Sequence, residues 1–136
     1  MSAANKAIIC TFNLQVIERC DRAAFEALVA ESFVNHTAAA GQPSDRESLW
    51  HTFRHVLHSG LTELRVEVLD QIAEHDKVTT RKRITGQHSG VLLGIPATGR
   101  AVSIDVMDIV RIEEGRYVEH WGINSLPTVL AALRLP

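Results

Sequence analysis

The spacing of apolar residues changes near residue 61 and divides the chain into two kinds of structure. Before this point apolar side chains recur three or four positions apart, which is the repeat of an amphipathic helix. This repeat predicts a helix over residues 4–20 and a second helix capped by Asp21. A Ser44–Glu47 capping box opens a third helix, which ends near Gly60.

Beyond Leu61 apolar and polar residues alternate, which is the repeat of a strand with one buried face. Two strands are expected on either side of a turn at His75–Asp76, and two more in a hairpin within residues 100–125. A short extended piece over residues 31–37 and a terminal helix over 126–133 complete the pattern.

This order of elements predicts one α+β domain over residues 1–136, because helices followed by strands pack as separate layers. We expect a curved, mostly antiparallel sheet with helices on its concave side. Such a cone-shaped α+β barrel would enclose a pocket of the kind that binds small ligands.

The hairpin carries the most informative residues. A three-residue loop over 113–115 would place Asp108 opposite His120 and Val106 opposite Gly122. The inner face would then carry an otherwise apolar set: Ile104, Val106, Asp108, Val110, Val118, His120, Gly122 and Asn124. This face is either a pocket wall with acid/base chemistry or a core with one satisfied polar pair.

Composition and charge exclude several functions. Fourteen basic and sixteen acidic residues give a net charge of −2, without a basic patch, so nucleic acid is not an expected partner. Cys10 and Cys20 lack zinc-site spacing and are expected to be reduced thiols. No signal peptide and no apolar run of membrane-spanning length is evident, so we expect a cytoplasmic protein with no membrane partner.

Four segments together resemble one known family: FVNHTA (33–38), LRVEVLDQIAEHDKV (64–78), GQHSGVLLGIPATGR (86–100) and DIVRIEEGRYVEHWG (108–122). They are similar to the SnoaL-like polyketide cyclases, also called ester cyclases, of the nuclear transport factor 2-like superfamily. The resemblance implies an α+β cone with a deep pocket, often in a homodimer or larger homo-oligomer. It also implies aldol ring closure of a hydrophobic carbonyl compound by acid/base residues, with no cofactor and no metal.

The resemblance carries over only in part at the level of single residues. The family histidine of the last strand matches His120, but the family's catalytic aspartate falls on Gly122. A glutamine and a histidine of the preceding strand fall on Val106 and Asp108. The alternative to an enzyme is therefore a ligand-binding or assembly module of the same fold.

Asp108 and His120 are the catalytic candidates. A buried carboxylate with a protonated partner could take a proton next to a carbonyl group, while the imidazole shuttles the proton or donates to the substrate. Alternatively the two side chains form a hydrogen bond that only rigidifies the wall. The remaining candidates are expected to bind substrate: His88, His36, Asn35, Val106, Gly122 and Asn124.

Other polar and apolar features are assigned to the surface. Lys82 shares the face of Ile84 and His88, where it could pair with Asp108 or bind an acidic substrate, but its neighbours Arg81 and Arg83 favour a solvated strand edge. The His51, His55 and His58 stripe is interpreted as solvated or subunit-facing. Val91–Ile95 forms either a lid or a fixed cover of the core. Homo-oligomerisation is expected through an outer sheet face that carries Met107, Ile109, Tyr117, Glu119 and Trp121.

Overall fold

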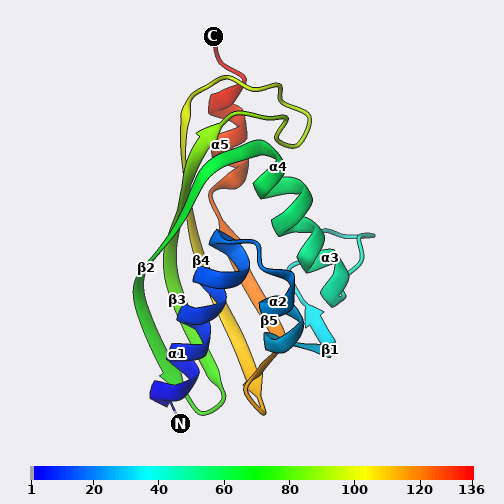
Figure 1. Cartoon of the computed structure of the whole chain (residues 1–136), viewed down its shortest axis with the longest axis vertical. Coiled ribbons are helices and arrows are strands. Elements are labelled where there is room, and N and C mark those ends of the chain that lie inside the picture. The colour runs from blue at the N-terminus through cyan, green and yellow to red at the C-terminus, as the bar shows by residue number, and fades with distance from the viewer. Residues whose placement is uncertain (1) are drawn as a thin grey trace.

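The computed structural model describes residues 2–136 and shows a curved sheet with helices packed against it (Figure 1). The helical segments are α1 (Ser2–Phe12), η1 (Asn13–Glu18), α2 (Arg22–Leu28), α3 (Arg46–His51), η2 (Thr52–Leu57), α4 (His58–Gly60) and α5 (Leu126–Leu133). The strands are β1 (Val29–Asn35), β2 (Leu61–Glu74), β3 (Lys77–His88), β4 (Ala101–Glu113) and β5 (Arg116–Asn124). The expected α+β fold with a mostly antiparallel sheet is confirmed.

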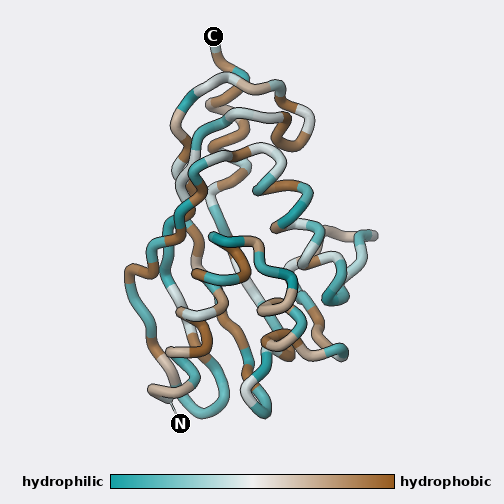
Figure 2. Tube along the Cα trace, viewed as in Figure 1, coloured by the Kyte–Doolittle hydropathy of each residue, from teal (hydrophilic) through white to brown (hydrophobic). Residues whose placement is uncertain are grey.

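The strands of this described part lie in the order β1-β5-β4-β3-β2. Neighbours from β2 to β5 are antiparallel, whereas β1 pairs parallel with β5 and places Asn35 beside His120. The predicted extended piece is thus a fifth strand, and it brings the FVNHT segment to the site. Both long hairpins end in hydrophilic turns, while apolar positions recur along the strands above them (Figure 2).

The first helix is not uniform along its predicted length. It is an α-helix up to Phe12 and a π-helix from Asn13 to Glu18. The buried Asn13 side chain donates from Nδ2 to the carbonyl of Ile9, 2.9 Å away. A π-turn inserts an extra residue in the helical repeat and is often found beside a functional site.

Helix capping follows the prediction at one helix and differs at another. Asp21 accepts hydrogen bonds from the amides of Ala23 and Ala24, as expected of a cap. At α3, however, the cap is Asp45, which accepts from the amide of Ser48. The predicted Ser44–Glu47 box does not form, because Glu47 pairs instead with Arg22 at 2.6 Å.

The β4–β5 hairpin has a different register from the one predicted. Glu114 and Gly115 both have positive φ, 52° and 76°, which suits a two-residue turn rather than a three-residue loop. A β-bulge at Arg111/Ile112 then shifts the pairing further, so Asp108 lies opposite Gly122 and not opposite His120. The predicted inner-face residues before and after the bulge keep their side of the sheet. Tyr117 does not follow the prediction, since its side chain is buried in the core.

The core lies between the helices and the inner face of the sheet. Phe12 of α1 stacks on Tyr117 of β5 with ring centroids 4.1 Å apart, which fixes the helix across the sheet. In residues 2–136 no helix is both long and apolar enough to cross a membrane.

Candidate active site

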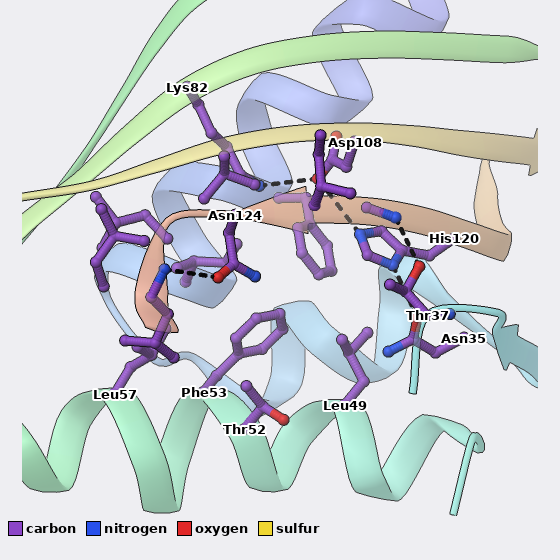
Figure 3. A pocket seen from close by; sticks show the side chains of 18 of the residues that line it. Asn35, Thr37, Leu49, Thr52, Phe53, Leu57, Lys82, Asp108, His120 and Asn124 are labelled. Atoms are coloured by element: carbon purple, nitrogen blue, oxygen red, sulfur yellow. Dashed lines mark hydrogen bonds and ion pairs between the residues drawn. The ribbon is translucent and has the colours of Figure 1, made fainter. Parts of the chain in front are cut away.

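A cavity of about 200 Å³ opens between the inner face of β3, β4 and β5 and the helix formed by α3 and η2 (Figure 3). Most of its wall is apolar, with Phe53, Leu49 and Leu57 on the helical side. Its polar wall residues are Asn35, Thr37, Thr52, Lys82, Asp108, Tyr117, His120 and Asn124. Because few polar groups converge in an apolar space, the cavity has the character of a ligand site.

The polar groups of the sheet side form one continuous chain of contacts (Figure 3). The Lys82 ammonium lies 3.3 Å from Oδ2 of Asp108, and Nε2 of His120 lies 3.5 Å from the same oxygen. On the far side of the ring, Nδ1 of His120 lies 2.9 Å from Oδ1 of Asn35. Side chains from β3, β4, β5 and the end of β1 therefore form one line of polar contacts along the cavity wall, in the order Lys82, Asp108, His120 and Asn35.

The Asn35 contact sets the orientation of the imidazole. Oδ1 of Asn35 also accepts from the backbone amide of Thr37 at 3.1 Å, which identifies this atom as the carboxamide oxygen. Nδ1 of His120 must then donate to it. Nε2, beside Asp108, is therefore the nitrogen that gains or loses a proton: when protonated it donates to the carboxylate, and in the neutral ring it carries the lone pair.

Asp108 is an ionised carboxylate in a buried position. Burial raises the pKa of its carboxyl group, but the Lys82 ammonium and the His120 hydrogen bond outweigh burial, and the pKa lies below its ordinary value. Only 5% of the side chain is exposed, against 21% for His120. Within the described residues, Oδ1 of Asp108 has no hydrogen-bond partner.

Gly122 makes the diagonal contact between His120 and Asp108 possible. A Cβ atom at this position would lie 2.9 Å from Cε1 and 3.1 Å from Nε2 of His120, and 3.3 Å from Cβ of Asp108. Because Gly122 has no side chain, the imidazole of His120 can occupy the space above residue 122 and reach Asp108. Gly122 also donates its amide to Oγ1 of Thr37 at 2.7 Å.

Asn124 is a donor to the cavity. Its Oδ1 accepts from the backbone amide of Leu126 at 2.9 Å, where α5 begins. Nδ2 is thereby left to face a ligand, since the carboxamide oxygen is already occupied. Val106 lies opposite Asn124 in the β4–β5 ladder and also lines the cavity.

His88 does not line the cavity, although the sequence suggested a substrate-binding role. Its ring is fully buried, Nδ1 accepts from the amide of Thr98 at 3.2 Å, and Nε2 contacts the carbonyl of Ile95 at 3.2 Å. Both nitrogens are therefore occupied by the loop between β3 and β4. Leu92 and Ile95 of this loop are buried, so it covers the core and is not among the segments that line the cavity.

His36 is also outside the cavity lining. Its Nε2 lies 2.7 Å from Oε2 of Glu119, and its ring stacks on Trp121 at 4.8 Å. Residues 119 and 121 alternate with His120 and Gly122 and so face the outer side of the sheet. His36 follows the last residue of β1, where a one-residue step reverses the side-chain direction relative to Asn35.

Lys82 and Tyr117 line the cavity and Asn13 contacts Lys82, although the sequence pattern favoured a solvated edge for Lys82 and the outer sheet face for Tyr117. Lys82 is 5% exposed and is not part of a solvated edge, because β2 covers the outer edge of β3. Its alternation with Ile84 on the inner face was the available signal. Asn13 gave a weaker signal, as a polar residue on the apolar face of the first helix.

The histidine stripe on the third helix is not arranged around a metal. Nε2 of His58 contacts the carbonyl of Ile17 at 2.6 Å, and the rings of His51 and His55 pack 5.1 Å apart. Over residues 2–136, no group of three His, Cys, Asp or Glu side chains is placed to hold a metal ion.

Comparisons with known proteins agree with this architecture. TsrD from Streptomyces laurentii has a similar structure, with a TM-score of 0.85 and 24% identity over 98% of this chain and 97% of that chain. IdmH from Streptomyces antibioticus, assigned as a polyketide cyclase, has a TM-score of 0.82 and 27% identity over 96% and 99% of the two chains. AclR from Streptomyces galilaeus, assigned as a hydroxylase, has a TM-score of 0.83 and 25% identity over 100% and 85%.

No curated protein sequence was found to match this chain. The family model for SnoaL-like polyketide cyclases matches residues 7–133, which is nearly the whole chain and includes every polar residue of the cavity wall. The protein therefore belongs to the SnoaL-like polyketide cyclase family.

Proposed function

We propose that this protein is a cofactor-independent acid/base enzyme that removes a proton next to the carbonyl group of a small hydrophobic compound. The observation that carries the proposal is the line of contacts from Lys82 through Asp108 and His120 to Asn35 on the wall of an apolar cavity. A cyclase, an isomerase or a related lyase would use the same first step. Family membership and the IdmH similarity favour the aldol-type cyclase.

In the proposed step His120 takes the proton, because it is the more exposed member of the pair. Nε2 accepts the proton from the carbon atom, and the electron pair of the broken bond moves onto the carbonyl oxygen to form an enolate. Asp108 balances the charge of the new imidazolium. This assignment exchanges the roles expected from the sequence, where Asp108 is the base.

Asn124 is proposed to bind the carbonyl oxygen. Its Nδ2 donors are preorganised by the contact of Oδ1 with the amide of Leu126, and fixed donors are most effective where negative charge develops. The cavity of about 200 Å³ is smaller than a site for a drug-sized ligand, which suits a compound of one or two rings. Val106 and Gly122 shape its apolar wall.

The second candidate is a binding protein without turnover. Gly122, in the position of the family's catalytic aspartate, favours it, because the remaining polar groups could orient a ligand without reacting. In either case we propose a cytoplasmic homodimer or larger homo-oligomer. Its interface would use the outer sheet face, where Met107, Ile109 and Ile123 are exposed.

The test is hydrogen–deuterium exchange at the carbon next to the carbonyl, followed by NMR in D₂O with 1-indanone and 2-tetralone. Exchange reports proton removal whatever reaction follows it in the cell. We expect the protein to accelerate exchange and the Asp108→Asn variant to lose about 10²-fold of that acceleration or more while keeping ligand affinity. Asp105→Asn, an exposed change on the same strand, is the matched control and should match wild type.

The outcomes separate the candidates. Ketone binding in a thermal-shift assay without accelerated exchange would support the binding protein and contradict the enzyme. Exchange that survives Asp108→Asn unchanged would remove Asp108 from the mechanism. The oligomer is tested separately by light scattering, where Ile109→Lys is expected to yield a smaller assembly.

A further inference from the structure

Lys82 is a buried ammonium at the end of the polar line, and the acid/base step as proposed does not use it directly. Its Nζ lies 2.7 Å from Oδ1 of Asn13 and 3.3 Å from Oδ2 of Asp108. Its side chain is 6% exposed, so solvent does little to screen its charge. A lysine so deeply buried requires a function or a compensating partner.

Asn13 anchors this lysine from the helical side. It is the first residue of η1, and its Nδ2 donates to the carbonyl of Ile9 at 2.9 Å. That hydrogen bond identifies the amide nitrogen and directs the carboxamide oxygen to the ammonium. The π-turn that begins at Asn13 therefore connects the first helix to the charged line on the sheet.

We propose that Lys82, anchored by Asn13, is a positioning residue that keeps the Asp108 carboxylate ionised and directed at His120. This inference rests on the acid/base function proposed above and assigns an additional pair of residues to it. Lys82 acts through Asp108 and need not touch the substrate.

The charges around Asp108 support this role. Three titratable groups face it: Lys82 from β3, and His120 and Tyr117 from β5. The Tyr117 phenol is neutral, because burial first and the Asp108 charge second raise its pKa well above the ordinary value. The helical side contributes the neutral carboxamide of Asn13 through Lys82. Lys82, 3.3 Å from Oδ2, is thus the cation that offsets the burial of Asp108.

Without Lys82, burial would favour the protonated form of Asp108. A neutral Asp108 could not balance the imidazolium that forms when His120 takes a proton from the substrate. A role for Lys82 as a covalent amine nucleophile is disfavoured, since that chemistry needs a free amine and the two acceptors bind the ammonium form. A purely stabilising role is also disfavoured, because a buried ion pair seldom exceeds an apolar pair of the same shape in stability.

The first test uses stability and does not depend on activity. In wild type the lowered pKa of Asp108 means that its contribution to stability is present above its unfolded pKa and is lost as pH falls through the folded one. In Lys82→Met, burial would raise the folded pKa of Asp108 above its unfolded value. The stability of this variant would then increase, rather than decrease, as the pH falls. The melting temperature at pH 8 should fall by about 10 °C or more and recover in part as pH is lowered toward 5.

Two variants keep this test decisive. Lys82→Met/Asp108→Asn leaves no buried charge in the pair, so it should fold even if the single variant does not and should show no such recovery at low pH. Lys77→Met changes an exposed lysine of the same strand and should retain the wild-type pH dependence. A Lys82→Met protein with the wild-type melting temperature at both pH 5 and pH 8 would overturn the proposal.

The second test uses the exchange assay. Lys82→Met should lower the exchange rate at least tenfold with little change in ketone affinity, and its rate should rise only at higher pH than in wild type. Asn13→Leu should shift the profile in the same direction by a smaller amount. An unchanged pH profile in Lys82→Met would overturn the positioning role. If wild type shows no exchange at all, the proposed enzyme fails while the melting curves still decide the state of Asp108.

Discussion

Two histidines on the inner face of the sheet, His120 and His88, show how the same side chain serves different ends. His120 lies on the cavity wall with one nitrogen held by Asn35 and the other beside Asp108. His88 lies at the far end of β3, fully buried, with both nitrogens occupied by the loop between β3 and β4. Position on an inner face is therefore not enough to indicate chemistry.

The difference lies in what each ring leaves unsatisfied. Nδ1 of His88 accepts from the amide of Thr98, so Nε2 is the donor to the carbonyl of Ile95, and this ring is fixed as a neutral hydrogen-bonding connector. Nδ1 of His120 donates to Asn35, which leaves Nε2 to exchange a proton. Hydrogen bonds to both ring nitrogens leave His88 no nitrogen for proton exchange. A single side-chain partner on Nδ1 instead orients His120 and leaves its Nε2 available.

The largest expected effect is on catalysis by His120. His120→Gln should abolish most of the accelerated exchange of 1-indanone, by about 10²- to 10⁴-fold, because the group that takes the proton is gone. Its melting temperature should change little, since the ring is partly exposed. Exchange that persists in this variant would assign the base elsewhere.

His88→Leu should lower the stability of the protein and leave the exchange rate unchanged, which is the opposite of the result expected for His120→Gln. The substitution removes the acceptor of the Thr98 amide and one of the two donors to the Ile95 carbonyl, which keeps its bond from the Leu92 amide, so we expect a loss of about 1–3 kcal/mol in the free energy of unfolding. Urea denaturation measures this loss. Per folded molecule the exchange rate should match wild type, and a selective loss of exchange would contradict the structural role.

Much of the fold follows from the sequence, because the change from helical to alternating spacing reports local burial directly. The inner face of β4 and β5 is predictable in the same way. The exact register is not, since it depends on whether Glu114 adopts positive φ and on one bulge at Arg111/Ile112. These two local events decide which residue lies opposite Asp108, and they turn Tyr117 inward.

The site is only partly predictable for a related reason. Asp108, His120 and Asn124 line the cavity as the alternation predicts, and Asn35 lines it as the family resemblance implies. The arginines beside Lys82 favour a solvated strand edge over the pairing with Asp108 that its inner-face position allows, and only tertiary packing reveals that β2 covers this edge. Its partner Asn13 comes from a helix 69 positions away in sequence, a contact that no local pattern predicts.

Gly122→Ala tests the geometry that distinguishes His120 from His88. The added Cβ would lie 2.9 Å from the His120 ring and displace it from Asp108. We expect about tenfold or greater loss of exchange, with a stability cost of about 1–3 kcal/mol from overpacking. Gly94→Ala, where a Cβ meets no atom within 4 Å, is the control outside the cavity: its positive φ should cost stability but leave exchange unchanged.

The smallest effects should come from removing the partner of each Nδ1. Thr98→Val takes Oγ1 away from His88 but keeps the backbone amide that Nδ1 accepts, so it should cost about 0.5–1.5 kcal/mol in stability and nothing in exchange. Asn35→Leu frees Nδ1 of His120 and allows the ring to turn, so it should lower exchange severalfold with a comparable small loss of stability. Urea curves and exchange rates measured on the same two proteins check this pair. If Asn35→Leu changed only stability, the contact between Asn35 and His120 would be purely structural, like the contacts of His88. The functional difference between the two histidines would then depend on Asp108 and Lys82 alone.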